Sequence, residues 1–92
     1  MKSYFLIHVQ HEGAARMALS KILPVQAEPW VLFDPKGNAV AYFNIDLEED
    51  VLQVQVDISG RHYNEDLKVI RVLRELQKMT GGIILDDFDN II

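Results

Sequence analysis

Histidines and aspartates are the residues of this chain whose chemistry suggests a site. His62 follows a Ser-Gly-Arg segment at residues 59–61, and Asp86-Asp87 follows a short apolar run. A histidine beside a carboxylate can transfer protons, and an arginine can hold an anion. These residues define a candidate acid–base set in which His62 is the base, Arg61 anchors an anion, and Asp86 or Asp87 orients the histidine. Ordinary polar surface is the alternative for the same residues, because loops and strand ends are polar in most proteins.

Metal and cofactor motifs are not found. His8 and His11 have the spacing H-x-x-H, but on a strand they would point to opposite faces. The acidic end at Asp86, Asp87 and Asp89 lacks the Asp-x-Asp-x-Asp-Gly pattern and following glutamate of a calcium loop. There is no cysteine, no G-x-S-x-G nucleophile motif and no glycine-rich phosphate loop. We therefore predict no metal, no cofactor and no covalent intermediate.

Composition indicates one globular domain over residues 1–92. The chain is 49% hydrophobic and 25% charged, with a net charge of −5. The Lys and Arg residues do not form the clusters that bind phosphate backbones, which argues against nucleic acid, and the acidic excess favours a basic partner. The apolar run at residues 4–7 is too short for a signal peptide or a membrane span. We expect a cytoplasmic protein that does not bind membranes.

Hydrophobic periodicity predicts the elements that must position these residues. Strands are expected at residues 4–10, 30–33, 39–46, 52–58 and 83–85, and helices at 12–23 and 65–80. Asn64 is the expected N-cap of the second helix and Gly81-Gly82 its end, while residues 34–38 form a turn. The order of elements resembles the ferredoxin-like plan with one strand added. This implies an α+β fold in which two helices cover one face of a mixed five-stranded sheet.

The tail at residues 88–92 either forms a last short strand or lies on the surface. In the expected topology the first, second, fourth and fifth strands run parallel, so their carboxyl ends meet at one edge of the sheet. Ligands favour that edge in open α/β sheets. We expect it to carry a polar group made of His11, Asp34, Arg61, His62, Asp86 and Asp87.

The sheet face away from the helices is expected to be partly apolar. The alternation in residues 52–58 puts Gln53, Gln55 and Asp57 on it. Such a face often packs against a second subunit or a ligand, although loops or the tail can also cover it. Other residues expected on it are some of Tyr4, Leu6, Trp30, Leu32, Tyr42 and Asn44.

Two functions are compatible with these patterns. The preferred one is a non-enzymatic binding or regulatory module that acts through protein–protein contacts, as a homodimer or with a basic partner. Its expected binding residues are Asp86, Asp87, Arg61, His62, Trp30 and Tyr42. The alternative is a small cofactor-independent enzyme with the acid–base set at the sheet edge. A flat, partly apolar exposed face favours the first function, and a concave pocket around His62 favours the second.

Overall fold

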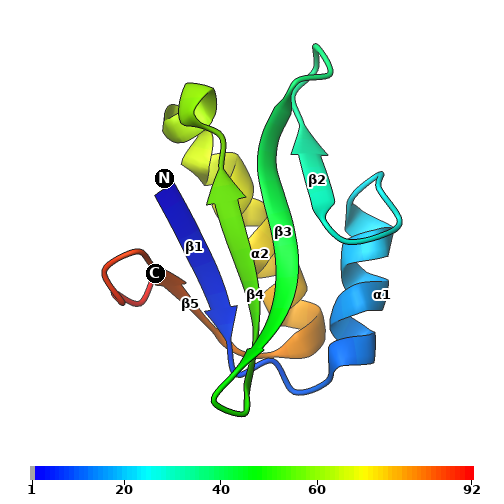
Figure 1. Ribbon diagram of the computed structural model, residues 1–92, viewed down its shortest axis with the longest axis vertical. Coiled ribbons are helices and arrows are strands. Elements are labelled where there is room, and N and C mark those ends of the chain that lie inside the picture. The colour runs from blue at the N-terminus through cyan, green and yellow to red at the C-terminus, as the bar shows by residue number, and fades with distance from the viewer. Residues whose placement is uncertain (1) are drawn as a thin grey trace.

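The computed structural model describes residues 2–92, which form a five-stranded sheet with two α-helices on one face (Figure 1). A short 3₁₀-helix, η1, precedes the second α-helix. The elements follow one another as β1 (Lys2–Ile7), α1 (Glu12–Ile22), β2 (Trp30–Phe33), β3 (Ala39–Glu48), β4 (Val51–Ile58), η1 (Gly60–Glu65), α2 (Asp66–Thr80) and β5 (Ile83–Asp86).

The sheet has the strand order β2-β3-β4-β1-β5, and every neighbouring pair is antiparallel. The predicted α+β class is confirmed, but the prediction of a mixed sheet is wrong and the ferredoxin-like order is not confirmed. The pairing makes β1 antiparallel to β2, so α1 does not connect parallel strands. Only α2 does so, because β4 and β5 both lie antiparallel to β1, which separates them.

Local sequence explains where the helices begin and end. The side chain of His11 caps α1 by accepting a hydrogen bond from the backbone N–H of Ala14 at 3.2 Å. Asn64 does not cap α2, because the chain passes through η1 and α2 begins only at Asp66. Gly81 ends α2 as predicted, with a φ of 72° that suits glycine.

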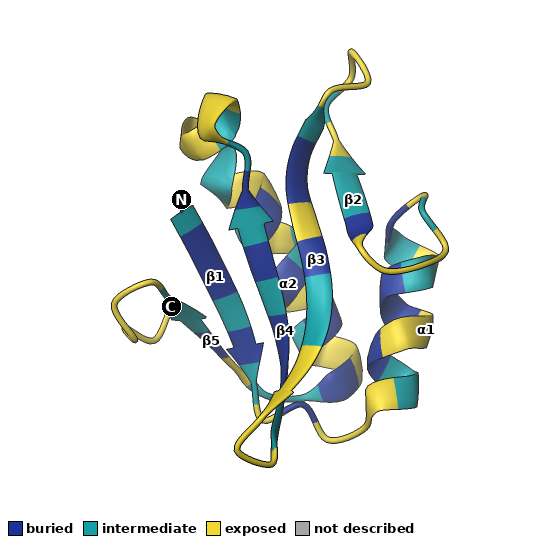
Figure 2. Cartoon of the chain, in the orientation of Figure 1, coloured by how far each residue is buried: buried dark blue, intermediate teal, exposed yellow. Residues whose placement is uncertain are grey.

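The core lies between the helices and one sheet face (Figure 2). Tyr4, Leu6 and Trp30 are buried there, which corrects the expectation that such residues are on the open face. Trp30 is only 1% exposed, and its indole N–H donates to Ser20 Oγ on α1 at 3.0 Å. Leu32 also packs against this core.

A β-bulge in β3 changes which residues face outward. Leu32 pairs with Ala41 and Phe33 with Ala39, so Val40 is the extra residue. Val40 and Ala41 are consecutive and both buried in the core. Consequently Ala39 and Tyr42, on either side of the bulge, both belong to the open face.

Two turns of the same design close the sheet at one edge. In the turn Asp34–Asn38 the Asp34 carboxylate accepts hydrogen bonds from both backbone and side chain of Asn38. Asp86 accepts the same bonds from Asn90. Each pair also joins the aspartate N–H to the asparagine carbonyl, at 2.9 Å and 3.0 Å. The second turn brings the tail back beside β5, where Ile92 N–H donates to Ile84 O.

One flank of β3 is left without a neighbouring strand. The pairing with β2 reaches only Phe43, while β3 continues to Glu48. The backbone N–H of Ile45 donates instead to the Glu28 carboxylate at 3.1 Å, and Arg16 holds that carboxylate at 3.3 Å. Neither α-helix of residues 2–92 is long and apolar enough to cross a membrane.

Candidate functional site

Five of the six polar residues predicted to share one edge of the sheet do so. The strands β2, β4 and β5 run in the same direction, so Asp34, Arg61, His62, Asp86 and Asp87 all lie at or just after the carboxyl ends of these strands (Figure 1). His11 does not belong to this group. It follows β1, which runs the opposite way, and its side chain is used in capping α1.

His62 lies between two carboxylates. Its Nε2 is 3.5 Å from Asp34 Oδ2 and 3.6 Å from Glu65 Oε2, and the imidazole is 13% exposed. Its Nδ1 is buried and has no hydrogen-bond partner within residues 2–92. Glu65 was not among the predicted site residues, although its i,i+3 spacing from His62 would have pointed to it once a helical turn was recognised there.

Asp86 and Asp87 do not contact His62 and form a separate region. The Asp86 carboxylate accepts hydrogen bonds from Asn90 within its own turn. The bond from the backbone N–H of Asn90 is the largest of the causes that lower the pKa of Asp86. The Asp87 carboxylate accepts from the backbone N–H of Ser3 at 2.9 Å. Both aspartates line a hollow of about 430 Å³ together with Lys2, Ser3, Tyr4 and Phe88.

A buried tyrosine links this edge to the core. Asp66 Oδ2 accepts from Lys2 Nζ and from the Tyr4 hydroxyl, each at 2.9 Å. The hydrogen bond from Lys2, followed by that from Tyr4, lowers the pKa of Asp66. Burial, followed by the bond to Asp66, raises the pKa of Tyr4. The charge of Lys2 is therefore neutralised on the helix side of the sheet.

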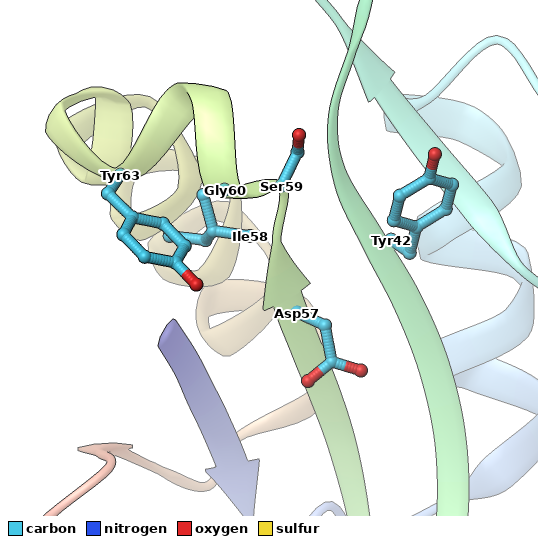
Figure 3. A pocket seen from close by; sticks show the side chains of 6 residues that line it. All are labelled: Tyr42, Asp57, Ile58, Ser59, Gly60 and Tyr63. Carbon is cyan, nitrogen blue, oxygen red and sulfur yellow. The ribbon is translucent and has the colours of Figure 1, made fainter. Parts of the chain in front are cut away.

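The open face has a hollow of about 340 Å³ between two tyrosines (Figure 3). Tyr42 on β3 and Tyr63 on η1 stand on opposite sides of it, and each is 40% exposed. Asp57 lies between them on β4. Its Oδ1 accepts from Ser3 Oγ at 2.7 Å and from Gln55 Nε2 at 3.1 Å, whereas Oδ2 has no hydrogen-bond partner within residues 2–92.

A second hollow, of about 380 Å³, adjoins the first. The two share Tyr42 and Ser59, and the second is also lined by Arg61 and His62. Arg61 forms no salt bridge in the part of the chain from residue 2 onward. The predicted residues Arg61, His62 and Tyr42 thus come together, while Trp30 supports the sheet from the core side.

The open face as a whole is acidic and partly apolar. In the described strands, its positions include two aspartates, one glutamate and no lysine or arginine, and Asp87 adds a fourth carboxylate at the rim. The positions read from the pairing are Ser3, Phe5, Ile7, Val31, Phe33, Ala39, Tyr42, Asn44, Asp46, Glu48, Val51, Gln53, Gln55, Asp57, Ile83 and Leu85.

No protein-family model, curated protein or solved structure matches the chain. We therefore infer function from the side chains of the open face and of the edge beside it.

Proposed function

We propose that this protein is a non-enzymatic binding module that holds a basic protein partner on its open sheet face. The observation that carries the proposal is the composition of that face, which combines exposed Tyr42, apolar residues and carboxylates with no cation. Aromatic residues at the centre of a patch supply much of the binding energy in protein complexes. Exposed sheet faces of this kind are common interaction sites.

Charge favours a basic partner over a second copy of the chain. The net charge is −5, and a homodimer through this face would bring two acidic surfaces together. Juxtaposed like charges are costly at an interface, whereas complementary charges speed association. Lys and Arg residues of this chain lie mainly on the helices, as Arg16, Lys21, Lys68, Arg71, Arg74 and Lys78.

Site-specific photocrosslinking in the source cells tests this proposal. A photoreactive residue replaces Asn44, which lies opposite Gln55 on the open face, and in a matched control it replaces Leu67, which is 73% exposed on α2. We expect a discrete adduct from position 44 and none from position 67.

The size and sensitivity of the adduct decide the outcome. An adduct with a basic protein that disappears in Asp57→Asn supports the proposal. An adduct of twice the chain's mass identifies a homodimer instead. Equal labelling from both positions, or none from position 44, overturns a binding role for this face.

A second candidate function is proton-transfer catalysis at the edge of the sheet. The observation in its favour is the position of His62, which contacts Asp34 and Glu65 and lines a hollow with Ser59 and Arg61. A histidine placed between carboxylates can act as a general base, with Arg61 holding an anionic substrate. The orienting carboxylate is then Asp34 or Glu65 instead of Asp86 or Asp87.

Deuterium incorporation tests the second function without knowledge of the product. A mixture of small carboxylic and keto acids in D₂O is incubated with the protein and followed by NMR. Catalysed exchange of a carbon-bound proton that is lost in His62→Gln supports an enzyme. Exchange at the same rate with and without protein rules out this chemistry for the compounds tested.

A further inference from the structure

We infer that the hollow between Tyr42 and Tyr63 receives a cationic side chain, lysine or arginine, of the protein partner. This inference rests on the proposed binding function and specifies the chemistry of its central contact. The proposed site consists of the rings of Tyr42 on β3 and Tyr63 on η1 and the carboxylate of Asp57 on β4 (Figure 3).

The carboxylate of Asp57 is held in place and has one oxygen to spare. Ser3 Oγ at 2.7 Å and Gln55 Nε2 at 3.1 Å both donate to Oδ1. These bonds fix the orientation of the carboxylate, and its other oxygen, Oδ2, receives no hydrogen bond from residues 2–92. A cationic N–H is the strongest donor a protein partner can offer to such an oxygen.

The two tyrosines favour the same ligand. Tyr42 and Tyr63 are each 40% exposed and border the hollow on opposite sides (Figure 3). An ammonium or guanidinium group is attracted to the face of an aromatic ring, and its aliphatic stem packs against ring carbons. With a volume of about 340 Å³ the hollow lies at the low end for ligand sites, which suits one long side chain better than a cofactor.

Other occupants fit the hollow less well. An anion would meet the charge of Asp57, and an apolar side chain would cover its free oxygen without a hydrogen bond, which is costly. The nearby cations do not neutralise Asp57. Lys2 is paired with Asp66, and Arg61 lines the adjoining hollow.

Peptide titrations followed by ¹⁵N–¹H NMR test the inference. The probes are three short, otherwise identical peptides with a central arginine, lysine or citrulline, the last being a neutral isostere of arginine. We expect the arginine or lysine peptide to shift the amide signals of Asp57, Ser59 and Tyr63 saturably, and the citrulline peptide to bind at least about tenfold more weakly. The comparison of arginine with lysine shows which cation the site prefers.

Variants identify the groups responsible. Asp57→Asn keeps the shape and the Ser3 contact, and we expect it to weaken the cationic peptide about tenfold. Tyr42→Leu should weaken it severalfold while Tyr42→Phe, which keeps the ring, should not. Arg61→Gln removes a repelling charge from the adjoining hollow and should leave binding equal or tighter. Thermal melting of each variant separates loss of binding from loss of fold.

The possible failures are distinguishable from those of the proposed function. If citrulline binds as tightly as arginine, or if Asp57→Asn binds normally, the cation site is wrong, whatever the photocrosslinking shows. If position 44 forms an adduct under those conditions, the face binds its partner by other contacts. If cationic peptides bind at Asp57 but no protein is crosslinked, the site stands and the proposed protein partner does not.

Discussion

The hydroxyl of Tyr4 is a polar group at the border of an apolar core. Tyr4 is 5% exposed, and its hydroxyl donates a 2.9 Å hydrogen bond to Asp66, which satisfies this nearly buried polar group. Asp66 in turn accepts from Lys2, so one carboxylate joins the start of β1 to the start of α2. These residues are far apart in the sequence, and no local pattern links them.

Replacing Tyr4 by phenylalanine should measure this link. The variant keeps the ring in the core but removes a hydrogen bond to a charged group, so we expect the free energy of unfolding to fall by about 1–2 kcal/mol. Urea denaturation gives the value. Tyr63→Phe is the matched control, because its hydroxyl makes no hydrogen bond within residues 2–92 and its loss should change little. Equal effects of the two substitutions would contradict the structural role of Tyr4.

Asp66 also predicts an acid dependence. Its pKa is lowered in the folded protein, chiefly by Lys2 and then by Tyr4, so its contribution to stability is present above the usual aspartate pKa of about 4. That contribution is lost as the pH falls through the lower folded pKa. We expect Asp66→Asn to be less stable than the natural protein near neutral pH, with a difference that shrinks from about pH 5 to about pH 2. A constant difference across that range would mean that the charge of Asp66 is unimportant.

At the scale of elements, the turns Asp34–Asn38 and Asp86–Asn90 show that a turn can be predicted from proline and glycine but is missed when both are lacking. The segment Asp34–Asn38 contains proline and glycine and was predicted as a turn from those residues. The segment Asp86–Asn90 makes the same hydrogen bonds without either residue, and Asp89 stands with a φ of 61° where Gly37 has 86°. Without the glycine signal, the sequence does not indicate that Asp86 belongs to a turn.

Opposite substitutions in the two turns should have opposite effects. Asp89→Gly relieves a left-handed backbone and should raise the free energy of unfolding by about 0.5 kcal/mol. Gly37→Ala imposes the same strain and should lower it by about 1 kcal/mol, although nothing lies within 4 Å of the added methyl group. Thermal melts of both variants test this equivalence. A loss of stability in Asp89→Gly would show that the Asp89 side chain does more than occupy the turn.

The patterns within single strands explain why some residues were predicted on the wrong face of the sheet. The types of the strands and α-helices followed from periodicity, most clearly in β4 and α2. The first strand was misplaced, because it runs from Lys2 to Ile7 and not over residues 4–10. In β1 both faces are apolar, so the sequence did not distinguish whether Tyr4 or Phe5 faces the helices. The bulge at Val40 lacks a glycine or proline that would have marked it.

At the scale of the whole molecule, strand order decides which residues meet. Sequence pattern placed Asp34, Arg61 and His62 at one edge correctly, since these follow strands that do run in the same direction. It could not place β1 between β4 and β5, because the two pairings join segments about 50 and about 80 residues apart. The Tyr42–Asp57–Tyr63 hollow depends on this arrangement, because Ser3 of β1 holds Asp57 from the side.

Charge separation across the molecule predicts how binding responds to salt. The open face carries carboxylates and the helices carry most of the cations, so a basic partner is steered toward one side. We expect its association rate to fall by about tenfold or more when salt rises from about 0.05 M to about 0.5 M, with a smaller change in the dissociation rate. Surface plasmon resonance with the crosslinked partner measures both. A rate that is independent of salt would show that the acidic face does not guide the encounter.

The carboxylate of Glu28 affects how readily two molecules of the protein associate in concentrated solution. Beyond Phe43 the flank of β3 has no neighbouring strand, and the Ile45 N–H there would be a template for the backbone of another molecule. Glu28 occupies this donor and places a negative charge at the point where a foreign strand would have to add. We therefore expect loss of the Glu28 carboxylate to make edge-to-edge association of molecules through β3 easier.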